Sequence, residues 1–219
     1  MAVRIGISGW SYDHWRGRFY PEGLPRGDEL AFAGEHFDTI EINRSFYSLV
    51  EPDTYRTWAA TGGDVVFAVK GGRFITHVKR LGDVETALAN FFASGVGELG
   101  DRLGPVLWQL PANFRWDETR VGRFLDMLPA DTREMARLAR RHDHRVSSPV
   151  PRVTRSSPVR HALEARHPSF LDEKALAMLR RHEVALVVSH SSSWPCMDQV
   201  TTDFMYVRLH GPGDLYSSA

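Results

Sequence analysis

The stretch Phe37-Asp-Thr-Ile-Glu-Ile-Asn-Arg-Ser-Phe-Tyr47 decides how the chain is interpreted, because it places a carboxylate inside an otherwise apolar strand pattern. Ile40 and Ile42 share one side of the predicted strand, while Glu41 and Asn43 share the other. A buried charge without a partner is costly in free energy, so Glu41 requires a cation, hydrogen bonds or a ligand opposite it. The rest of the sequence must supply that partner.

Composition excludes several classes of protein. The 219 residues contain 27 Lys and Arg against 27 Asp and Glu, so no net charge attracts nucleic acid or an anionic membrane. Cys196 is the single cysteine, which excludes a disulfide framework and a thiolate zinc site. The strand pattern begins by Val3 and no run of 18 apolar residues follows. We expect one domain over residues 1–219, in the cytoplasm and without a membrane segment.

Hydrophobic patterns predict seven strands, most of them followed by a helix. One strand carries Glu41, and the others are expected at residues 3–8, 65–70, 105–110, 159–165, 184–189 and 204–209. Helices are expected at residues 28–36, 52–60, 83–99, 119–128, 131–141 and 171–182. The segment 147–158 is rich in proline and serine and is predicted to be a loop. Strands and helices that alternate in this way indicate a parallel sheet.

The two sides of the predicted strands differ. One side is bulky and apolar in almost every strand, as expected beneath a layer of helices. The other side is small or mixed and becomes polar at the carboxyl end. A doubly wound open sheet would carry apolar residues on both sides. The pattern therefore predicts a TIM-type (β/α) barrel that is incomplete, with an eighth strand and helix missing and a gap between the first and seventh strands.

Short motifs occur at the ends of the predicted strands and in the first loop. They are Ile7-Ser-Gly-Trp10, Phe19-Tyr-Pro21, Thr39-Ile-Glu-Ile-Asn43 with Ser45-Phe-Tyr47, Phe67-Ala-Val-Lys70, Val106-Leu-Trp-Gln-Leu-Pro111, Glu164-Ala-Arg-His-Pro168 and Tyr206-Val-Arg-Leu-His-Gly211. In this order the chain resembles the YecE-like family (domain of unknown function 72) over essentially its whole length.

The resemblance implies a TIM-barrel fold and no established activity. By analogy of architecture with endonuclease IV and the xylose-isomerase-like barrels, it suggests nucleic-acid binding or the chemistry of a hydrolase or isomerase. The aromatic-Asn-Asn motif that family members usually carry in a final strand and helix is absent from this sequence.

Polar side chains at the strand ends should converge at the mouth of the barrel, where the active sites of TIM barrels lie. We assign candidate catalytic roles to Glu41 and Glu164 as acid or base, and to Lys70 and His210 as charge stabilisers. The candidate ligand-binding residues are Trp10, Asn43, Gln109, Arg166, His167 and Arg208. Two structural alternatives stay open: an ion pair between Glu41 and Lys70 that only satisfies both charges, and His167 as the cap of the following helix.

The same mouth also contains residue types that bind divalent metals. Glu41, Glu164, His167 and His210 would be such a set, with His190 nearby. Lys70, Arg166 and Arg208 would oppose a dication, and three cations against two carboxylates leave a net charge of +1. The sequence thus favours a phosphate or carboxylate ligand, and we predict no cofactor and no metal.

Two functions follow from this set of residues. The first is an enzyme that acts on a phosphoester, a sugar phosphate or another small anionic ligand. The alternative is a non-catalytic nucleic-acid binder that uses the same cations with the aromatic and arginine residues of the first loop, residues 10–20. These aromatics could instead pack on one another. The arginines of segment 133–145 are expected on a solvated outer helix. The sequence does not specify the substrate or the oligomeric state.

Overall fold

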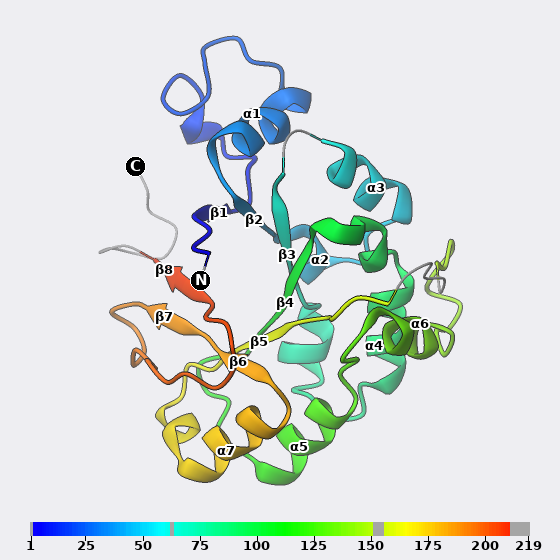
Figure 1. The fold of residues 1–219 in the computed structure, drawn as a ribbon, viewed down its shortest axis with the longest axis vertical. Coiled ribbons are helices and arrows are strands. Elements are labelled where there is room, and N and C mark those ends of the chain that lie inside the picture. Colours follow the sequence, from blue (N-terminus) through cyan, green and yellow to red (C-terminus); the bar gives the residue numbers. More distant parts are fainter. Residues whose placement is uncertain (1, 62–63, 151–155, 211–219) are drawn as a thin grey trace.

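The computed structural model describes residues 2–61, 64–150 and 156–210 (Figure 1). Within these ranges a sheet of six strands runs in the order β1-β2-β3-β4-β5-β6. The strands are β1 (Gly6–Ser8), β2 (Thr39–Ile42), β3 (Val66–Lys70), β4 (Leu103–Gln109), β5 (His161–Glu164) and β6 (Val184–Leu186). Every neighbouring pair is parallel, so all six carboxyl ends lie at one edge. The predicted α/β class and parallel sheet are confirmed.

A second parallel pair consists of β7 (Val188–His190) and β8 (Val207–Leu209). The sequence predicts one strand over residues 184–189, and the structure divides it at Val187. The N–H of Val187 donates to the Leu163 carbonyl at 3.0 Å, whereas the N–H of Val188 donates to the Tyr206 carbonyl at 2.9 Å. The chain therefore leaves its pairing with β5 and begins its pairing with β8 within one residue.

Seven α-helices occur in the described ranges: α1 (Glu29–His36), α2 (Arg44–Tyr47), α3 (Pro52–Ala60), α4 (Glu85–Ala93), α5 (Glu118–Asp126), α6 (Thr132–Ala139) and α7 (Glu173–Arg181). Aspartates cap three of them, since Asp117, Asp131 and Asp172 each accept a backbone N–H of the first turn. The predicted helix 83–99 is too long. Gly95 adopts a φ of 118°, which ends the helical segment, and a separate 3-10 segment follows at Val96–Arg102.

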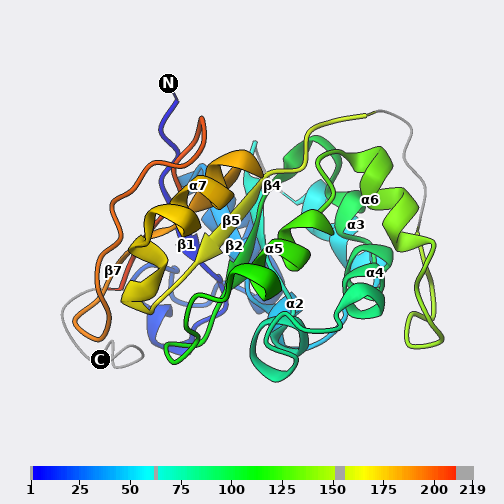
Figure 2. The ribbon, with the colours of Figure 1, turned by 90° about the horizontal axis from the view of Figure 1, so that it is seen from below.

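The core lies between the sheet and the helices that Figures 1 and 2 show along β3 and β4. The predicted apolar side of the strands faces this core, and Ile40, Ile42, Phe67 and Trp108 are completely buried. The opposite side carries a smaller apolar cluster that includes Leu107, Ala162, Ala185 and Val187, against which Phe204 and Tyr206 pack. Different parts of the chain thus cover the two faces of the sheet.

The ends of the strand series depart from the predicted pattern. Ile5, Val207 and Leu209 belong to the apolar side of the first and last predicted strands, which the pattern predicts to lie beneath helices, but they are 68%, 51% and 78% exposed. Among the described residues no backbone pairing joins β1 to β8, and the predicted incomplete barrel with its gap stays a prediction. The pairings seen do not by themselves define a barrel. No helix in the described ranges has the length and apolar character needed to cross a membrane.

Candidate functional site

Glu41 is the centre of a hydrogen-bond network at the carboxyl edge of the sheet. The residue is 5% exposed. Strand pairing places Ser8 beside it, and Ser8 Oγ donates to Glu41 Oε1 at 2.9 Å. Tyr206 Oη donates to Oε2 at 2.8 Å. Arg208 donates from Nη2 to Oε1 at 2.9 Å and from Nε to Oε2 at 3.1 Å. The partner that Glu41 requires is therefore the guanidinium of β8.

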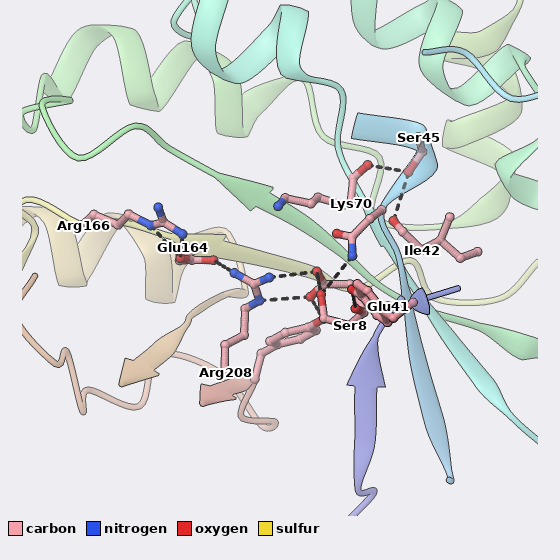
Figure 3. Close-up of polar contacts among 11 residues, drawn as sticks. Ser8, Glu41, Ile42, Ser45, Lys70, Glu164, Arg166 and Arg208 are labelled. Carbon is pink, nitrogen blue, oxygen red and sulfur yellow. Dashed lines mark hydrogen bonds and ion pairs between the residues drawn. The ribbon is translucent and has the colours of Figure 1, made fainter. Parts of the chain in front are cut away.

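Glu164 is fully buried and binds two arginines (Figure 3). Arg208 Nη1 donates to its Oε2 at 2.5 Å. Arg166 Nε donates to Oε1 at 2.8 Å, and Arg166 Nη2 forms an ion pair with the same oxygen at 2.7 Å. Burial alone would raise the pKa of Glu164, but the positive charges of Arg208 and Arg166 hold that pKa below its usual value. Arg208 thus connects β8 to both β2 and β5 through its side chain.

Lys70 ends β3 and is 8% exposed. Its Nζ lies 4.5 Å from the centroid of the Phe46 ring, and it forms no ion pair with any described carboxylate. The alternative of a Glu41–Lys70 ion pair is therefore wrong, because Arg208 takes that position. Burial, followed by the positive charge of Arg208, lowers the pKa of Lys70 to about 8, while the negative charges of Glu41 and Glu164 act in the opposite direction.

Asn43 and Gln109 lie beside the charged residues. Asn43 Nδ2 donates to Ser8 Oγ at 3.0 Å and so extends the network of Glu41. Gln109 is 7% exposed, at the end of β4, in register with Glu164. Both are neutral hydrogen-bonding groups at the edge where the sequence predicts them.

His210 follows β8, and its ring lies 5.4 Å from that of Trp194. Burial and the charge of Arg208 lower the pKa of His210, which favours the neutral ring at pH 7. Its Nε2 is buried without a hydrogen-bond partner among the described residues. The ring therefore fits a hydrogen-bonding role better than the predicted role of a cationic charge stabiliser.

Two predicted ligand-binding residues make contacts of another kind. His167 Nδ1 accepts the N–H of Ser169 at 3.2 Å and caps the 3-10 turn Pro168–Leu171, as the structural alternative expects. The Trp10 ring packs edge-on against Trp58 at 5.4 Å. Neither contact belongs to the charged network.

The aromatic residues of the first loop pack on one another and on α1. Trp15 lies edge-on to Phe19 at 5.4 Å, and Phe19 to Phe32 at the same distance. Arg16, which the sequence places among these aromatics, forms an ion pair with the buried Glu29 at 2.6 Å. These contacts fit the interpretation of the loop as a self-packed unit.

The arginine-rich helix α6 lies in the outer layer, where the sequence places it. It buries Met135, Ala136 and Ala139 on the side that packs against α4. Arg137 forms an exposed ion pair with Glu134 at 3.1 Å. The helix is remote from the charged network in sequence and in its contacts.

The structure adds site residues that sequence reasoning did not select. Tyr206 and Ser8 both donate hydrogen bonds to Glu41. Strand alternation places them on the same side of their strands as the predicted site residues, so this alternation could have identified them. Trp194 lies in a loop without periodicity, and its ring is 3.9 Å from the Arg166 guanidinium. No local sequence signal marks it.

The charged network is chemically distinct from two surface hollows elsewhere on the protein. One hollow lies among Asp83, Glu85, Asp117 and Arg120, and the charged residues that line it are exposed. The other, between α3 and the segment 148–150, is also lined by exposed charges. In the described ranges no group of three or more His, Cys, Asp or Glu residues is arranged to hold a metal ion.

Fold and site together define an α/β protein whose parallel sheet holds a buried charged network at its carboxyl edge. The profile of a family described as "Protein of unknown function DUF72" matches residues 4–219. The chain belongs to this family, which confirms the resemblance seen in its motifs.

Two curated proteins are similar to part of the chain. The chain is similar to the UPF0759 protein YecE of Escherichia coli K12 and of Escherichia coli O157:H7, at 29% identity over 131 residues in each case. The aligned region is 59% of this chain and 45% of either relative, so the chain spans less than half the length of the curated relatives it matches.

Solved structures of DUF72 proteins share the fold. A DUF72 family protein from Thermotoga maritima MSB8 superimposes with a TM-score of 0.73 at 24% identity, over 100% of this chain and 78% of that chain. A second, from Enterococcus faecalis V583, gives a TM-score of 0.67 at 16% identity, over 96% and 71%. At these identities the likeness concerns the fold alone.

Proposed function

We propose that the carboxyl edge of the sheet binds a small anionic ligand, and that the chain is a single domain built as an open (β/α) barrel with this edge as its mouth. The supporting observation is the charge balance of the buried network. Glu41 and Glu164 are offset by Arg208 and Arg166, and Lys70 adds a further positive charge without a carboxylate partner in the described ranges. Three cations minus two carboxylates give a net charge of +1.

A bound phosphate or carboxylate would supply the missing partner of Lys70, because a buried ammonium without a counter-ion is costly. Neutral groups at the same edge are available for hydrogen bonds to the ligand: Asn43, Gln109 and Nε2 of His210, which has no partner within the described part of the chain. Two arginines hold Glu164 ionised, and Glu41 accepts four hydrogen bonds. We therefore assign the carboxylates to holding Arg208 rather than to proton transfer.

The test is thermal unfolding in increasing inorganic phosphate, with sodium chloride at matched ionic strength as reference. Ligand that binds only the folded state raises its stability by RT ln(1 + [L]/Kd). We expect a saturable rise in Tm for the wild type and for Lys70→Arg, which keeps the charge, and its loss in Lys70→Met. Lys79→Met, at an exposed lysine, is the matched control.

A rise that does not saturate, or one that Lys70→Met retains, would show that phosphate acts elsewhere. Titration with a single-stranded oligonucleotide at several salt concentrations covers the second function. Binding that depends on salt and is unchanged by Lys70→Met would place nucleic acid on another surface and contradict the proposed site.

A further inference from the structure

Lysine is rare in this chain, which contains three lysines and 24 arginines. Lys79 and Lys174 are exposed, so Lys70 is the buried one of the three lysines, all of which lie in the described ranges. At the carboxyl edge the chain uses arginine for both cations that bind carboxylates, and lysine where no described carboxylate is in reach. A guanidinium does not lose its proton in proteins, whereas an amine can. Position 70 therefore carries the cation of this network that can become a nucleophile.

We infer that Lys70 is a Schiff-base nucleophile, whose amine condenses with a small aldehyde or ketone that bears an anionic group. The inference rests on the proposed anion site and names the substrate class of that site. Its geometric basis is the position of Nζ, which lies over the apolar Phe46 ring at 4.5 Å from the centroid and forms no ion pair with a described carboxylate. In the view of Figure 3 the Lys70 side chain points in the direction of Glu164 and Arg166, and no interaction is drawn to its nitrogen.

The surroundings raise the neutral fraction of the Lys70 amine near physiological pH, although the ammonium stays the major form. Glu41 faces Lys70 from β2, Glu164 and Arg166 from the end of β5, and Arg208 from β8. His77 lies on the other side, against Phe46 at 5.2 Å, and burial with nearby positive charge lowers its pKa to about 4, so it adds no positive charge. With a pKa of about 8, a substantial minority of Lys70 is unprotonated at pH 7.5. Desolvation and a neighbouring cation are the established means of activating lysine for this chemistry.

The reaction balances without a further reactant. The lone pair of the neutral amine attacks the carbonyl carbon, and the C–N bond forms while the C=O electron pair moves to oxygen. The oxygen takes up the proton that the nitrogen, now carrying a positive charge, gives up. Loss of that oxygen as water, with one more proton from solvent in the net reaction, gives the protonated imine. The imine carries the same single positive charge as the ammonium, so an anionic substrate keeps its counter-charge throughout.

The experiment is reductive trapping on the full chain. Protein is incubated at pH 7.5 with glyoxylate, an aldehyde that carries a carboxylate, and with sodium cyanoborohydride, whose hydride reduces the imine carbon and fixes a carboxymethyl group on the amine. Peptide mass spectrometry then measures the rate of modification at each of the three lysines. We expect Lys70 to react at least about tenfold faster than the exposed Lys79 or Lys174, because burial and a neighbouring cation lower the pKa of Lys70 and so raise its neutral fraction at this pH.

Acetaldehyde, which lacks the carboxylate, is the matched neutral aldehyde. Its preference for Lys70 should be smaller than that of glyoxylate, because it gains from the lowered pKa of the amine but not from the anion site. Equal rates at all three lysines, or no modification of Lys70 by glyoxylate, would overturn the inference. The measurement is made on the wild type, so it does not depend on whether a variant folds.

The trapping result is independent of the anion test. If phosphate stabilises the wild type and Lys70→Arg in a saturable way while Lys70 is not trapped, the Schiff-base inference is wrong and the anion site stands. If phosphate has no effect and Lys70 is still trapped at the expected rate with both aldehydes, the anion site is wrong and the inference loses its anionic substrate.

Discussion

At the scale of single residues, Arg208 makes the contacts on which the site depends. Its side chain is 10% exposed and binds two carboxylates whose side chains are 5% and 0% exposed. Negative charge from Glu41 and Glu164 outweighs burial and raises the pKa of Arg208 above its usual value. Removal of this guanidinium would leave two buried carboxylates with Arg166 as their nearest paired cation.

We therefore expect Arg208→Met to lower the free energy of unfolding by about 3–5 kcal/mol, the usual effect of removing one partner of a buried ion pair. Urea denaturation at pH 7 measures this. Arg180→Met is the matched control, because the Arg180–Glu173 pair is exposed and should contribute less than about 1 kcal/mol. Equal effects of the two substitutions would mean that the buried network does not depend on Arg208.

Lys70 gives a prediction of pH dependence. Its pKa is about 8 in the folded state and 10.5 for the free side chain, so between these values the unfolded chain binds more protons than the folded one. Stability from this group must then rise with pH across that window, and below pH 8 the cost of the buried ammonium is fully present. The difference corresponds to about 3 kcal/mol.

Urea denaturation of the wild type and Lys70→Met at pH 7, 8, 9 and 10 tests this prediction. The difference between the two proteins removes the contribution of tyrosines that titrate in the unfolded chain. We expect Lys70→Met to be the more stable protein at pH 7 and the advantage to shrink as pH rises. If the difference in unfolding free energy between the two proteins is the same at all four pH values, the pKa of Lys70 is not lowered in the folded state.

At the scale of secondary structure, the junction of β3 and β4 holds Lys70 in place. Gly71 follows Lys70, and its N–H donates to the Leu107 carbonyl at 2.8 Å. A Cβ at Gly71 would lie 2.3 Å from Cε3 of Trp108, whose indole N–H donates to His161 at 3.2 Å. The glycine is required for this close approach of backbone and indole.

Gly71→Ala should lower the free energy of unfolding by about 1–3 kcal/mol, the range found when a packed core receives an extra methyl group. Gly72→Ala is the matched control, since its Cβ would meet nothing closer than the Ser45 carbonyl at 3.9 Å. Guanidinium denaturation measures the free energy of unfolding of both variants. If Gly71→Ala proves as stable as Gly72→Ala, the Trp108 ring can move and the junction is not tightly packed.

The elements that the sequence predicts well are those whose pattern reflects a single packing surface. Ile40, Phe67 and Trp108 are buried on the predicted side because alternation along a strand fixes which face meets the helices. Boundaries set by one backbone angle, such as the end of α4 at Gly95, lie outside what periodicity can show.

The composition of the site was predictable, whereas its pairing was not. Strand phase brings Glu41, Glu164 and Arg208 to one edge, as expected. Which cation binds which carboxylate depends on the distance of β8 from β2 and β5. The curvature of the sheet sets this distance, and the sequence pattern does not show it. The sequence therefore could not show that Lys70 is left without a carboxylate.

At the scale of the whole molecule, β8 is attached differently from the central strands. Its described backbone pairing is with β7, and its connection to β2 and β5 is made by the Tyr206 and Arg208 side chains. The outward residues Val207 and Leu209 are exposed. By contrast, β3 and β4 each pair on both sides and lie in the core.

We expect backbone amides of β8 to exchange with deuterium at least tenfold faster than those of β3 and β4, because few buried contacts oppose local opening there. Hydrogen exchange with mass spectrometry on the full chain measures the difference. Protection of β8 equal to that of β3 would show that another chain or segment covers its outward face in solution.

The stacking of Arg166 on Trp194 makes the site visible to optical spectroscopy. An indole 3.9 Å from a guanidinium, and next to a histidine ring, emits according to the local electric field and to quenching by its neighbours. Subtracting the fluorescence of Trp194→Phe from that of the wild type isolates this emission from the five other tryptophans. Occupancy of the site can then be followed in real time without a label.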